Sequence, residues 1–372
     1  MIKSFNVTGL NRTRSYKIKF HDDVNIITGT NGSGKTNLVK LLWYMLSGNL
    51  ERILPEISFR NAKLVTDKIA LSISHKPLDE LGVHEIKVDI KLQDADAEIH
   101  SIRYRSIEEA CQWLNELNRK IITHTDASIF FPTFRRIEGG FNLKAPLMHR
   151  RYDVGGESNA INRIFREYSE RISVRQHLFV TSVSADDMVR IVTSRYAEAS
   201  AETNKLHAEL SSYIMKITGD YGASASKSIG KSASALDRIR EKADAVRGKQ
   251  ELALKPFSVV SNAVAQIFQH PGIRMTDSII FGSERGCVDV DLLSAGEKQM
   301  LGFLCYNTLF KDSVFCIDEP ELSLHPDWQR TLIPMLLDQK SGNQIIATTH
   351  SPFIISKYPD KEIRLVSDTG GC

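Results

Sequence analysis

The stretch Gly29-Thr30-Asn31-Gly32-Ser33-Gly34-Lys35-Thr36 fills every fixed position of the pattern GxxxxGK[ST]. In such a loop the successive backbone N–H groups form a concave anion site, because glycine allows the chain to pass close to a phosphate. The residues 23–27 before the loop predict a buried strand, and residues 37–46 after it predict a helix. The strand–loop–helix order therefore predicts an α/β domain that binds the phosphates of a nucleotide.

Side chains of this loop have the chemistry that a nucleotide and its metal ion require. The Lys35 ammonium would reach the β- and γ-phosphates, and the Thr36 hydroxyl would coordinate Mg²⁺. The residues predicted to hold the nucleotide here are Asn31, Gly32, Ser33, Gly34, Lys35, Thr36 and Asn37.

A pair of carboxylates follows a second apolar segment far along the chain. Residues 314–317 predict a buried strand that ends in Asp318 and Glu319. A rigid strand would deliver Asp318 to the water shell of Mg²⁺, and Glu319 would orient or deprotonate the attacking water. Such a pair is common after strands, but in a chain with a phosphate loop it predicts the second half of a nucleotide site.

Composition sets limits on the class of protein. The chain has 372 residues, 42% hydrophobic and 25% charged, with a net charge of +3, which is typical of a globular protein with two or three domains. This net charge alone does not indicate nucleic acid. Five cysteines without CxxC spacing favour a reducing compartment, and no apolar run reaches membrane-spanning length. We therefore expect a cytoplasmic chain without a membrane partner.

Periodicity divides the chain into three parts. Residues 1–136 predict an N-terminal lobe with the phosphate loop and a small antiparallel sheet in its alternating segments over 62–105. A capping box at residues 106–109, with Ser106 as the cap, predicts a helix that extends to about residue 118. Residues 137–255 predict a helical insert, with helices over 157–177, 185–218 (capped by Ser184) and 235–254 and a Ser/Gly/Lys-rich break at 222–234. Residues 256–372 predict a C-terminal lobe with a parallel sheet. Because no heptad repeat is sustained, we expect a compact insert and no long coiled coil.

Three further motifs carry a family resemblance. The segment 293–299 (LSAGEKQ) resembles the LSGGQ signature of ABC-type ATPases, 318–326 (DEPELSLHP) resembles their Walker B and D-loop, and 348–351 (TTHS) resembles their switch histidine. The resemblance implies an ABC-type ATPase head with an inserted helical subdomain, and ATP and Mg²⁺ as cofactors. Within that superfamily the chain resembles the SMC-related branch, and most of all the overcoming-lysogenization-defect (OLD) ATPases and the anti-phage ATPases of the PARIS, Septu and retron-linked systems.

The resemblance also implies roles for residues outside the loop. Ser294 and Gly296, with Glu297 beside them, would contact the γ-phosphate of an ATP bound by a second protomer, which gives a head-to-tail homodimer or a larger homo-oligomer. His350 would touch the γ-phosphate held by Lys35 of its own protomer. The catalytic residues predicted are thus Lys35, Glu319 and His350, and the predicted metal ligands are Thr36 and Asp318.

Two positions depart from the family pattern. The stretch 130–136 (FFPTFRR) stands where a Q-loop glutamine is usual and has none. Arg135 or Arg136 could meet phosphate, nucleic acid or a partner there, or the two could form a solvated pair. His325 occupies a D-loop position where aspartate is usual, which bears on communication between the two sites of a dimer.

The motifs leave the biological role open between two classes. No Toprim-type acidic pair and no HNH-like cluster follows the switch histidine, so we expect the ATPase to control a separately encoded effector, a Toprim or HNH nuclease or a toxin. The alternative is an SMC- or RecF-like DNA-repair ATPase that clamps DNA when ATP binds.

Basic residues are concentrated in the region 135–175. They predict either a nucleic-acid contact or a solvated helix face in which Glu157, Glu167 and Glu170 are ion-pair partners. The basic residues of this region are Arg135, Arg136, Lys144, Arg150, Arg151, Arg163, Arg166, Arg171 and Arg175.

Overall fold

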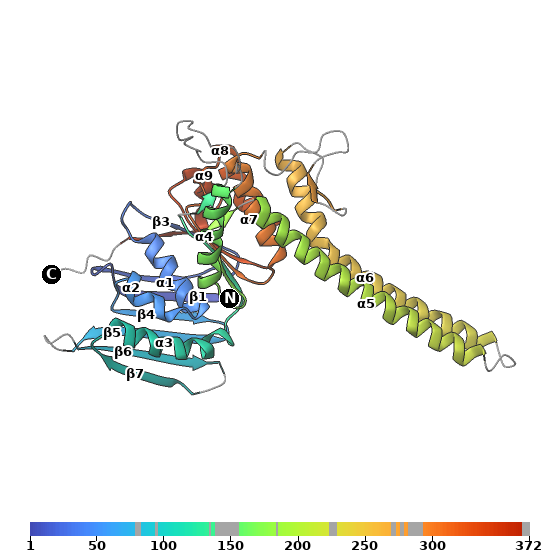
Figure 1. Cartoon of the computed structure of the whole chain (residues 1–372), viewed down its shortest axis with the longest axis horizontal. Helices are drawn as coiled ribbons and strands as arrows, with labels where there is room; N and C mark the ends of the chain where they lie inside the picture. The colour runs from blue at the N-terminus through green and yellow to red at the C-terminus, as the bar shows by residue number, and fades with distance from the viewer. Residues whose placement is uncertain are drawn as a thin grey trace. The chain divides into compact units, whose positions relative to one another are not determined.

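The computed structural model describes residues 1–78, 83–93, 96–133, 135–137, 156–183, 185–222, 229–268, 273–275, 279–281 and 293–366. The chain divides into two units (Figure 1). The first unit contains Met1–Ser184, Ser294–Phe303 and Phe310–Cys372, and the second contains Ala185–Leu293 and Leu304–Leu309. The three parts predicted from the sequence follow the motifs instead, and their boundaries remain a prediction.

An antiparallel sheet of six strands forms one layer of the first unit. Its order is β2-β1-β4-β5-β6-β7. The strands are β1 (Ile2–Leu10), β2 (Arg14–Lys19), β4 (Asn61–Thr66), β5 (Ile69–Pro77), β6 (His84–Leu92) and β7 (Glu98–Tyr104). The sheet is larger than the one expected from 62–105, because β1 pairs with β4 across more than fifty residues of intervening chain and brings β2 with it.

A parallel sheet forms the second layer, in the order β10-β8-β14-β15-β3-β16. All five neighbouring pairs of strands run parallel. The strands are β3 (Val24–Thr28), β8 (Ser128–Phe131), β10 (His177–Phe179), β14 (Val314–Asp318), β15 (Gln344–Thr348) and β16 (Glu362–Arg364). Since β3, β8, β14 and β15 are buried along their whole length, they read as apolar runs and not as alternating strands. The predicted α/β class is confirmed.

Helix α1 (Lys35–Ser47) joins the two sheets into one core. It contacts β1 and β4 of the antiparallel sheet and β8, β14 and β15 of the parallel sheet. Its apolar residues are buried on almost every side, as a helix between two layers requires. Trp43 lies at the centre, with its ring 5.7 Å from Phe130 and 5.4 Å from Phe179.

Further helices and two short strands complete the first unit. They are η1 (Leu50–Arg52), α2 (Ile53–Glu56), α3 (Ile107–Ile122), β9 (Arg136–Ile137), α4 (Gly156–Ile172), β11 (Ser182–Val183), α8 (Pro326–Asp338), α9 (Pro352–Ile355) and η3 (Pro359–Lys361). The predicted cap of α3 is confirmed, because the Ser106 hydroxyl accepts a bond from the backbone N–H of Glu108 at 3.2 Å.

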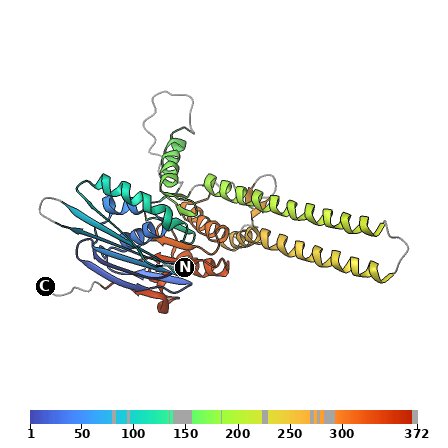
Figure 2. The same ribbon diagram turned by 90° about the horizontal axis from the view of Figure 1, so that it is seen from below.

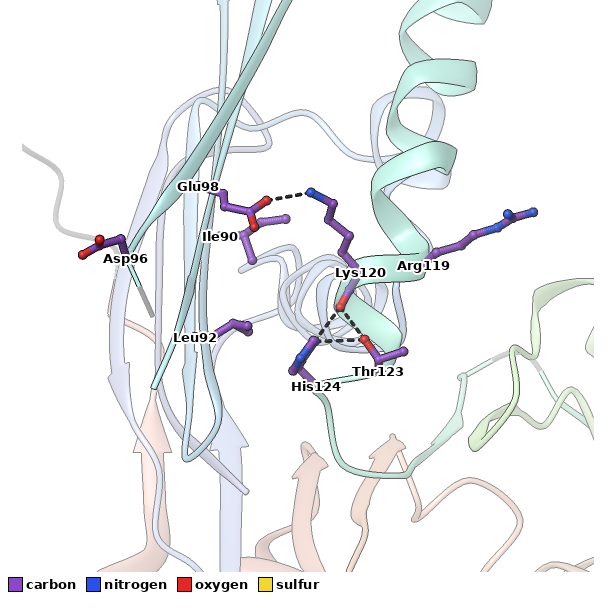
Figure 3. Close-up of a pocket in the computed structure, with 8 residues that line it drawn as sticks. All are labelled: Ile90, Leu92, Asp96, Glu98, Arg119, Lys120, Thr123 and His124. Carbon is purple, nitrogen blue, oxygen red and sulfur yellow. Dashed lines mark hydrogen bonds and ion pairs between the residues drawn. The ribbon is translucent and has the colours of Figure 1, made fainter. Parts of the chain in front are cut away.

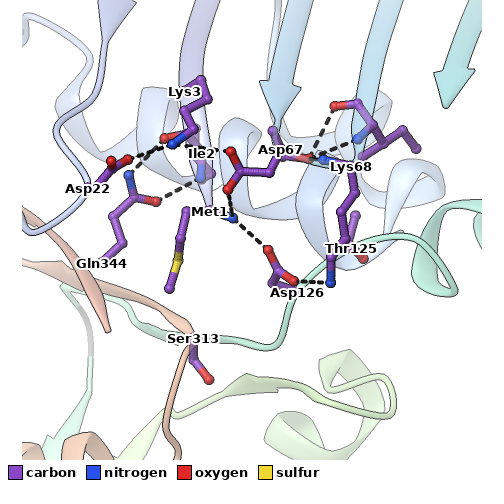
Figure 4. Close-up of polar contacts among 12 residues, drawn as sticks. Met1, Ile2, Lys3, Asp22, Asp67, Lys68, Thr125, Asp126, Ser313 and Gln344 are labelled. Atoms are coloured by element: carbon purple, nitrogen blue, oxygen red, sulfur yellow. Dashed lines mark hydrogen bonds and ion pairs between the residues drawn. The ribbon is translucent and has the colours of Figure 1, made fainter. Parts of the chain in front are cut away.

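Polar contacts near the N-terminus tie the two sheets together (Figure 4). The fully buried Gln344 of β15 accepts a bond from the backbone N–H of Ile2 and donates one to its carbonyl, both at 2.8 Å. The Met1 ammonium lies 2.9 Å from Asp67 and 2.6 Å from Asp126. These bonds join segments that are more than sixty residues apart in sequence.

The second unit consists mainly of two long helices that lie side by side (Figures 1 and 2). They are α5 (Ala185–Gly222) and α6 (Ile229–Phe268). The expectation of a compact insert is wrong. The buried residues of the two helices include the polar Thr203 as well as apolar residues such as Val192 and Val246, so the apolar repeat is too diluted to read as heptads. The predicted cap at Ser184 lies outside the described residues.

Helix α6 also extends further than the sequence predicts. It passes through Pro256 and ends at Phe268, whereas the prediction ended the helix at residue 254. A proline inside a helix removes one backbone bond and costs about 3 kcal/mol. Packing offsets that cost, since the ring of Phe257 meets Tyr196 of α5 edge-on at 5.3 Å. The remaining described elements are α7 (Ala295–Leu309), which belongs to both units, and the hairpin of β12 (Ile273–Met275) and β13 (Ile279–Phe281). Among the described helices, none combines the length and apolar character required to cross a bilayer.

Candidate nucleotide site

Three neighbouring parallel strands bring the predicted motifs to one edge of the sheet. Strand β15 pairs with β14 on one side and with β3 on the other. Because the carboxyl ends of parallel strands meet at the same edge, the phosphate loop after β3, the carboxylates that end β14 and the histidine after β15 converge there. Backbone bonds fix this junction: Glu319 N–H donates to the Thr348 carbonyl and Thr349 N–H to the Ile27 carbonyl, both at 3.0 Å.

The phosphate loop has the backbone that its glycines permit. Gly32 and Gly34 have φ angles of 74° and 87°, in the left-handed region that residues with a Cβ rarely adopt. A Cβ at Gly34 would also lie 3.1 Å from the amide nitrogen of Asn11. Tyr16 fixes the loop from outside by donating its hydroxyl to the Ser33 carbonyl at 2.6 Å. The loop leads directly into the N-terminus of α1, a site that favours anions.

Lys35 lies across the loop with its side chain buried. Its Nζ donates to the carbonyls of Gly29 at 3.0 Å and Thr30 at 3.4 Å. Burial lowers the pKa of the Lys35 ammonium, while the nearby carboxylates of Glu319 and Asp318 act in the opposite direction. The ammonium and the two carboxylates therefore interact within one site.

The other predicted loop residues are accessible or bonded locally. Asn31, Gly32 and Thr36 are exposed. The Asn37 amide donates to Asn11 Oδ1 at 2.8 Å, which joins the first turn of α1 to the end of β1.

Asp318 is fully buried at the end of β14. Its two carboxylate oxygens accept bonds from the hydroxyls of Thr133 and Thr348, which fix the orientation of the group. Mg²⁺ prefers oxygen ligands and usually takes only one or two from the protein, with phosphates and waters supplying the rest. The Thr36 hydroxyl and the Asp318 carboxylate fit that donor set.

Glu319 and His350 lie next to each other. Glu319 Oε1 is 3.9 Å from His350 Nε2, and the backbone N–H of His350 donates to Glu321 at 2.7 Å. Glu319 has a φ of 49°, a left-handed conformation that costs a residue with a Cβ of the order of 1 kcal/mol. A non-glycine residue held in this conformation at the end of a strand indicates that its position is fixed by the surrounding structure.

Arg135 is part of this site, which sequence reasoning did not predict. The residue is only 9% exposed, so the prediction of a solvated pair does not describe it. It donates to the carbonyls of Pro132, Asp318 and Glu319 at 3.0, 2.8 and 2.9 Å. Burial lowers the pKa of the guanidinium to about 10, so it remains charged at neutral pH. The side chain of Arg136 lies outside the described residues.

The signature segment begins α7 with a capping box. Ser294 N–H donates to the Glu297 carboxylate at 2.7 Å, and Glu297 N–H donates to the Ser294 hydroxyl at 3.3 Å. A Cβ at Gly296 would lie 2.5 Å from the backbone oxygen of Ser323, so the glycine permits close packing on the D-loop. The predicted contacts of these residues with a second protomer remain a prediction. In the D-loop, His325 caps α8 through its Nδ1, which accepts from Asp327 N–H at 3.4 Å.

A hollow of about 480 Å³ opens beside the phosphate loop. The hydroxyl of Thr28 donates to Glu362 at 2.5 Å on its wall. The residues that line it are Thr28, Gly29, Thr30, Thr349, His350, Ile355, Glu362, Arg364, Leu365 and Val366. The first loop residues and His350 thus share one open hollow.

A second pocket, of about 400 Å³, lies between β6, β7 and the end of α3 (Figure 3). Ile90 and Leu92 supply its apolar wall, and Lys120 pairs with Glu98 at 2.6 Å on its rim. It contains none of the predicted site residues, and both signs of charge surround it.

The basic region around residues 135–175 is only partly described. Arg171 and Arg175 are exposed, and Arg166 is half-buried. Arg135 is buried and is therefore not one of the basic residues exposed on this surface. The backbone of Arg136 is described as part of β9, and Arg163 lies in α4. The side chain of Arg163 and the residues Lys144, Arg150 and Arg151 lie outside the described part of the chain, so nucleic-acid binding stays a prediction.

These features define an α/β protein with the arrangement of motifs found in ABC-type ATPase heads. The family described as "AAA domain, putative AbiEii toxin, Type IV TA system" matches residues 24–356, and the chain belongs to this family.

Two curated relatives confirm the predicted resemblance to retron-linked ATPases. The "Retron Vc95 probable ATPase" of Vibrio cholerae serotype O1 biovar El Tor is 28% identical over 116 residues, which is 28% of this chain and 22% of that protein. The "Retron Ec83 probable ATPase" of Escherichia coli is 33% identical over 89 residues, which is 20% of this chain and 16% of that protein. The similar part thus spans less than a quarter of each relative.

Solved structures of SMC heads are similar over most of the chain, at low identity. The Smc head domain with an extended coiled coil bound to the C-terminal domain of ScpA, derived from Pyrococcus furiosus, has a TM-score of 0.38 at 13% identity, covering 95% of this chain and 91% of that chain. The SMC head domain from Thermotoga maritima has a TM-score of 0.40 at 12% identity, covering 96% and 91%.

Proposed function

We propose that the chain binds Mg-ATP and hydrolyses it to ADP and phosphate. The observation that carries this proposal is the convergence of Lys35, Asp318, Glu319 and His350 at the ends of β3, β14 and β15. One cation, a pair of carboxylates and a histidine beside an anion-binding loop are the groups that phosphoryl transfer to water requires.

Each group has a distinct role in the proposed reaction. Thr36 and Asp318 would hold Mg²⁺, which when bound neutralises charge on the β- and γ-phosphate oxygens. Glu319 would accept a hydrogen bond from the attacking water and take up its proton, and His350, 3.9 Å from Glu319, would contact the γ-phosphate. The strained backbone of Glu319 and the bonds around it hold the carboxylate ready for this step.

Replacing the proposed base separates binding from chemistry. The amide of Glu319→Gln can still donate and accept hydrogen bonds but cannot take up a proton, so we expect Mg-ATP binding to persist while turnover falls about 100-fold or more. Fluorescent-nucleotide titration and phosphate release measure the two quantities. A Glu319→Gln protein that hydrolyses ATP at the wild-type rate would show that Glu319 is not the base.

We also propose that ATP closes two chains head-to-tail, with Ser294 and Gly296 of one protomer at the γ-phosphate of the other. The position of Ser294 at the N-terminus of the helix α7 supports this, because such a terminus favours an anion. The bonds between Glu297 and Ser294 suit a role for Glu297 in shaping this terminus. Light scattering of Glu319→Gln with ATP should show a dimer, and adding Ser294→Arg should leave a monomer. ATP-dependent dimers that still hydrolyse ATP in Ser294→Arg alone would exclude the trans arrangement.

The proposed biological role is control of a separately encoded effector, a nuclease or toxin, in anti-phage defence. Support comes from the family, whose description names a toxin of a type IV system, and from relatives named as retron ATPases. Purification of Glu319→Gln with ATP from a native host tests this role. A co-purifying nuclease or toxin would support it.

A second candidate function is a DNA clamp of the SMC or RecF kind. The observation that favours it is the long helical pair of α5 and α6, which resembles the coiled coils of that branch. The same purification discriminates the two, since ATP-bound dimers that carry DNA and no second protein would favour the clamp.

A further inference from the structure

Arg135 is a buried cation whose hydrogen bonds all go to backbone. Its Nη1 donates to the carbonyls of Pro132 and Asp318, and its Nη2 donates to the carbonyl of Glu319. Removing a guanidinium from water costs several kcal/mol, and here three carbonyl acceptors and the nearby carboxylates offset that cost. The planar fork of arginine suits this arrangement, because two nitrogens in one fixed plane reach two successive carbonyls at once.

Those two carbonyls belong to the residues that carry the proposed chemistry. Strand β14 ends at Asp318, and the chain turns at Glu319 with a φ of 49°. The Glu319 carbonyl accepts a bond from the backbone N–H of Leu322 at 3.3 Å. The shorter bond from Arg135, at 2.9 Å, ties the same oxygen to a segment far away in sequence and stabilises the unusual conformation.

Arg135 also connects this turn to α7. Its guanidinium carbon lies 5.4 Å from the ring centre of Phe303, and that ring packs edge-on against Phe131 at 5.0 Å. Two other residues of α7 contact the same stretch of chain. Gln299 donates to the Pro320 carbonyl at 2.8 Å, and Gly296 packs against the backbone of Ser323.

These three residues of α7 lie on one face of the helix. Gly296, Gln299 and Phe303 are separated by three and four residues, which places the three positions on the same side. This face of α7 contacts the segment 318–323 at three places. Gly296 packs against Ser323 at the end of the segment, and Gln299 bonds Pro320 in its middle. Phe303 contacts Arg135, which in turn bonds the Glu319 carbonyl. A shift of α7 would therefore move the backbone of Glu319.

We propose that Arg135 is a positioning residue that fixes the Glu319 turn and couples it to the signature helix α7. It rests on the proposed function, since the turn it holds carries the proposed base. Arg135 lies in the stretch 130–136, where a Q-loop glutamine is usual in the family pattern. Its hydrogen bonds go to the backbone of Asp318 and Glu319. Through Phe303, a partner or nucleotide that engages the N-terminus of α7 changes the position of Glu319.

The test compares two conservative substitutions in the full chain. Arg135→Lys keeps the charge but has one donor nitrogen in place of the two that reach the Asp318 and Glu319 carbonyls, so it cannot reproduce the planar arrangement of these bonds. Arg52→Lys is the matched control, because Arg52 also donates to a backbone carbonyl, that of Arg171 at 3.0 Å, far from the motifs in sequence. We expect Arg135→Lys to lower kcat about tenfold to a hundredfold, with affinity for Mg-ATP changed less than about threefold.

Hydrogen exchange gives a second readout that does not depend on turnover. Amides of the peptide over 318–323 should exchange faster in Arg135→Lys than in wild type, and Arg52→Lys should match wild type. If Arg135→Lys keeps the wild-type kcat and exchange rates, the proposal is wrong. A parallel loss of ATP affinity and melting temperature, with kcat unchanged at saturating ATP, would show a purely structural role and also overturn it.

The outcomes for the two proposals are distinguishable. A wild-type chain that binds no ATP or does not hydrolyse it contradicts the proposed function, whereas the exchange measurement still tests whether Arg135 holds the turn. The variant Phe303→Leu tests the coupling to α7, since it removes the ring but not the hydrogen bonds. We expect it to lower kcat less than Arg135→Lys does, and an unchanged kcat would exclude α7 from the coupling.

Discussion

The edge of the parallel sheet and the helical pair are held by different kinds of interaction. At the sheet edge, bonds join segments that are far apart in sequence, as when the Arg135 guanidinium reaches residues 183 and 184 positions away. In α5 and α6, the backbone bonds are local to each helix, and the buried residues include the polar Thr203 as well as apolar ones. A single substitution should therefore change nucleotide affinity or stability strongly at the sheet edge and weakly along the helices.

The largest contrast is expected between two lysines. Lys35→Ala removes the ammonium that spans the phosphate loop, so affinity for Mg-ATP should fall at least about 100-fold. Lys249→Ala removes an exposed charge from α6 and should leave affinity unchanged. Nucleotide titration measures both. Equal affinities of the two variants would show that the loop does not bind the phosphates.

Alanine substitutions at two glycines, one in α7 and one in α6, should change the free energy of unfolding in opposite directions. A Cβ at Gly296 would lie 2.5 Å from a backbone oxygen that cannot move aside, so Gly296→Ala should cost about 1–3 kcal/mol. A Cβ at Gly248 in α6 meets nothing within 4 Å, so Gly248→Ala should stabilise the helix by about 0.5–1 kcal/mol. Urea unfolding measures both free energies. Effects of the same sign would contradict the packing described for Gly296.

Acid should weaken the parallel sheet at the amino ends of its strands, through the buried His177 that begins β10. Burial lowers the pKa of His177 to about 4, and its ring bonds the hydroxyls of Ser128 at 2.8 Å and Thr125 at 3.2 Å. Because the unfolded chain binds the proton more tightly, the stabilisation is complete above pH 6.5 and is lost as pH falls towards 4.

The corresponding loss of unfolding free energy should be about 2 kcal/mol between pH 6.5 and 5. Urea unfolding at the two pH values measures it in wild type and in His177→Gln, in which this contribution is missing. A pH dependence that is equally steep in His177→Gln would assign the effect to other groups.

The smallest effect is expected on the surface of the helical pair. Arg247 and Glu251 of α6 are 3.2 Å apart with side chains 78% and 69% exposed, and such pairs contribute about 0.3–0.5 kcal/mol. Glu251→Gln should therefore change the melting temperature by a degree or two at most. A larger loss of stability would show that this face of α6 is engaged in a way that the pair alone does not explain.

The motifs could be predicted from the sequence because their chemistry is local. The phosphate loop, the strand before Asp318 and the cap at Ser106 each depend on a few successive residues, and the structure forms all three. The convergence of Lys35 and Glu319 followed from the parallel order of strands. The catalytic and ligand roles of these residues stay predictions.

What could not be predicted depends on contacts between distant segments. The pairing of β1 with β4 and the bonds of Gln344 have no signal in local periodicity. Two successive arginines suggest an exposed pair in the sequence. Because β8 lies beside β14, the Arg135 side chain instead bonds the end of β14 and is buried. The length of α6 was underestimated because a proline ends most helices, whereas packing on α5 carries this one past Pro256.

The most direct test of the proposed site is a crystal structure of Glu319→Gln with Mg-ATP. We expect the phosphates in the loop Gly29-Thr30-Asn31-Gly32-Ser33-Gly34-Lys35-Thr36, the metal ion between the Thr36 hydroxyl and Asp318, and residue 319 facing the γ-phosphate. A nucleotide bound elsewhere, or a metal ion that contacts neither Thr36 nor the water shell next to Asp318, would contradict the proposed site.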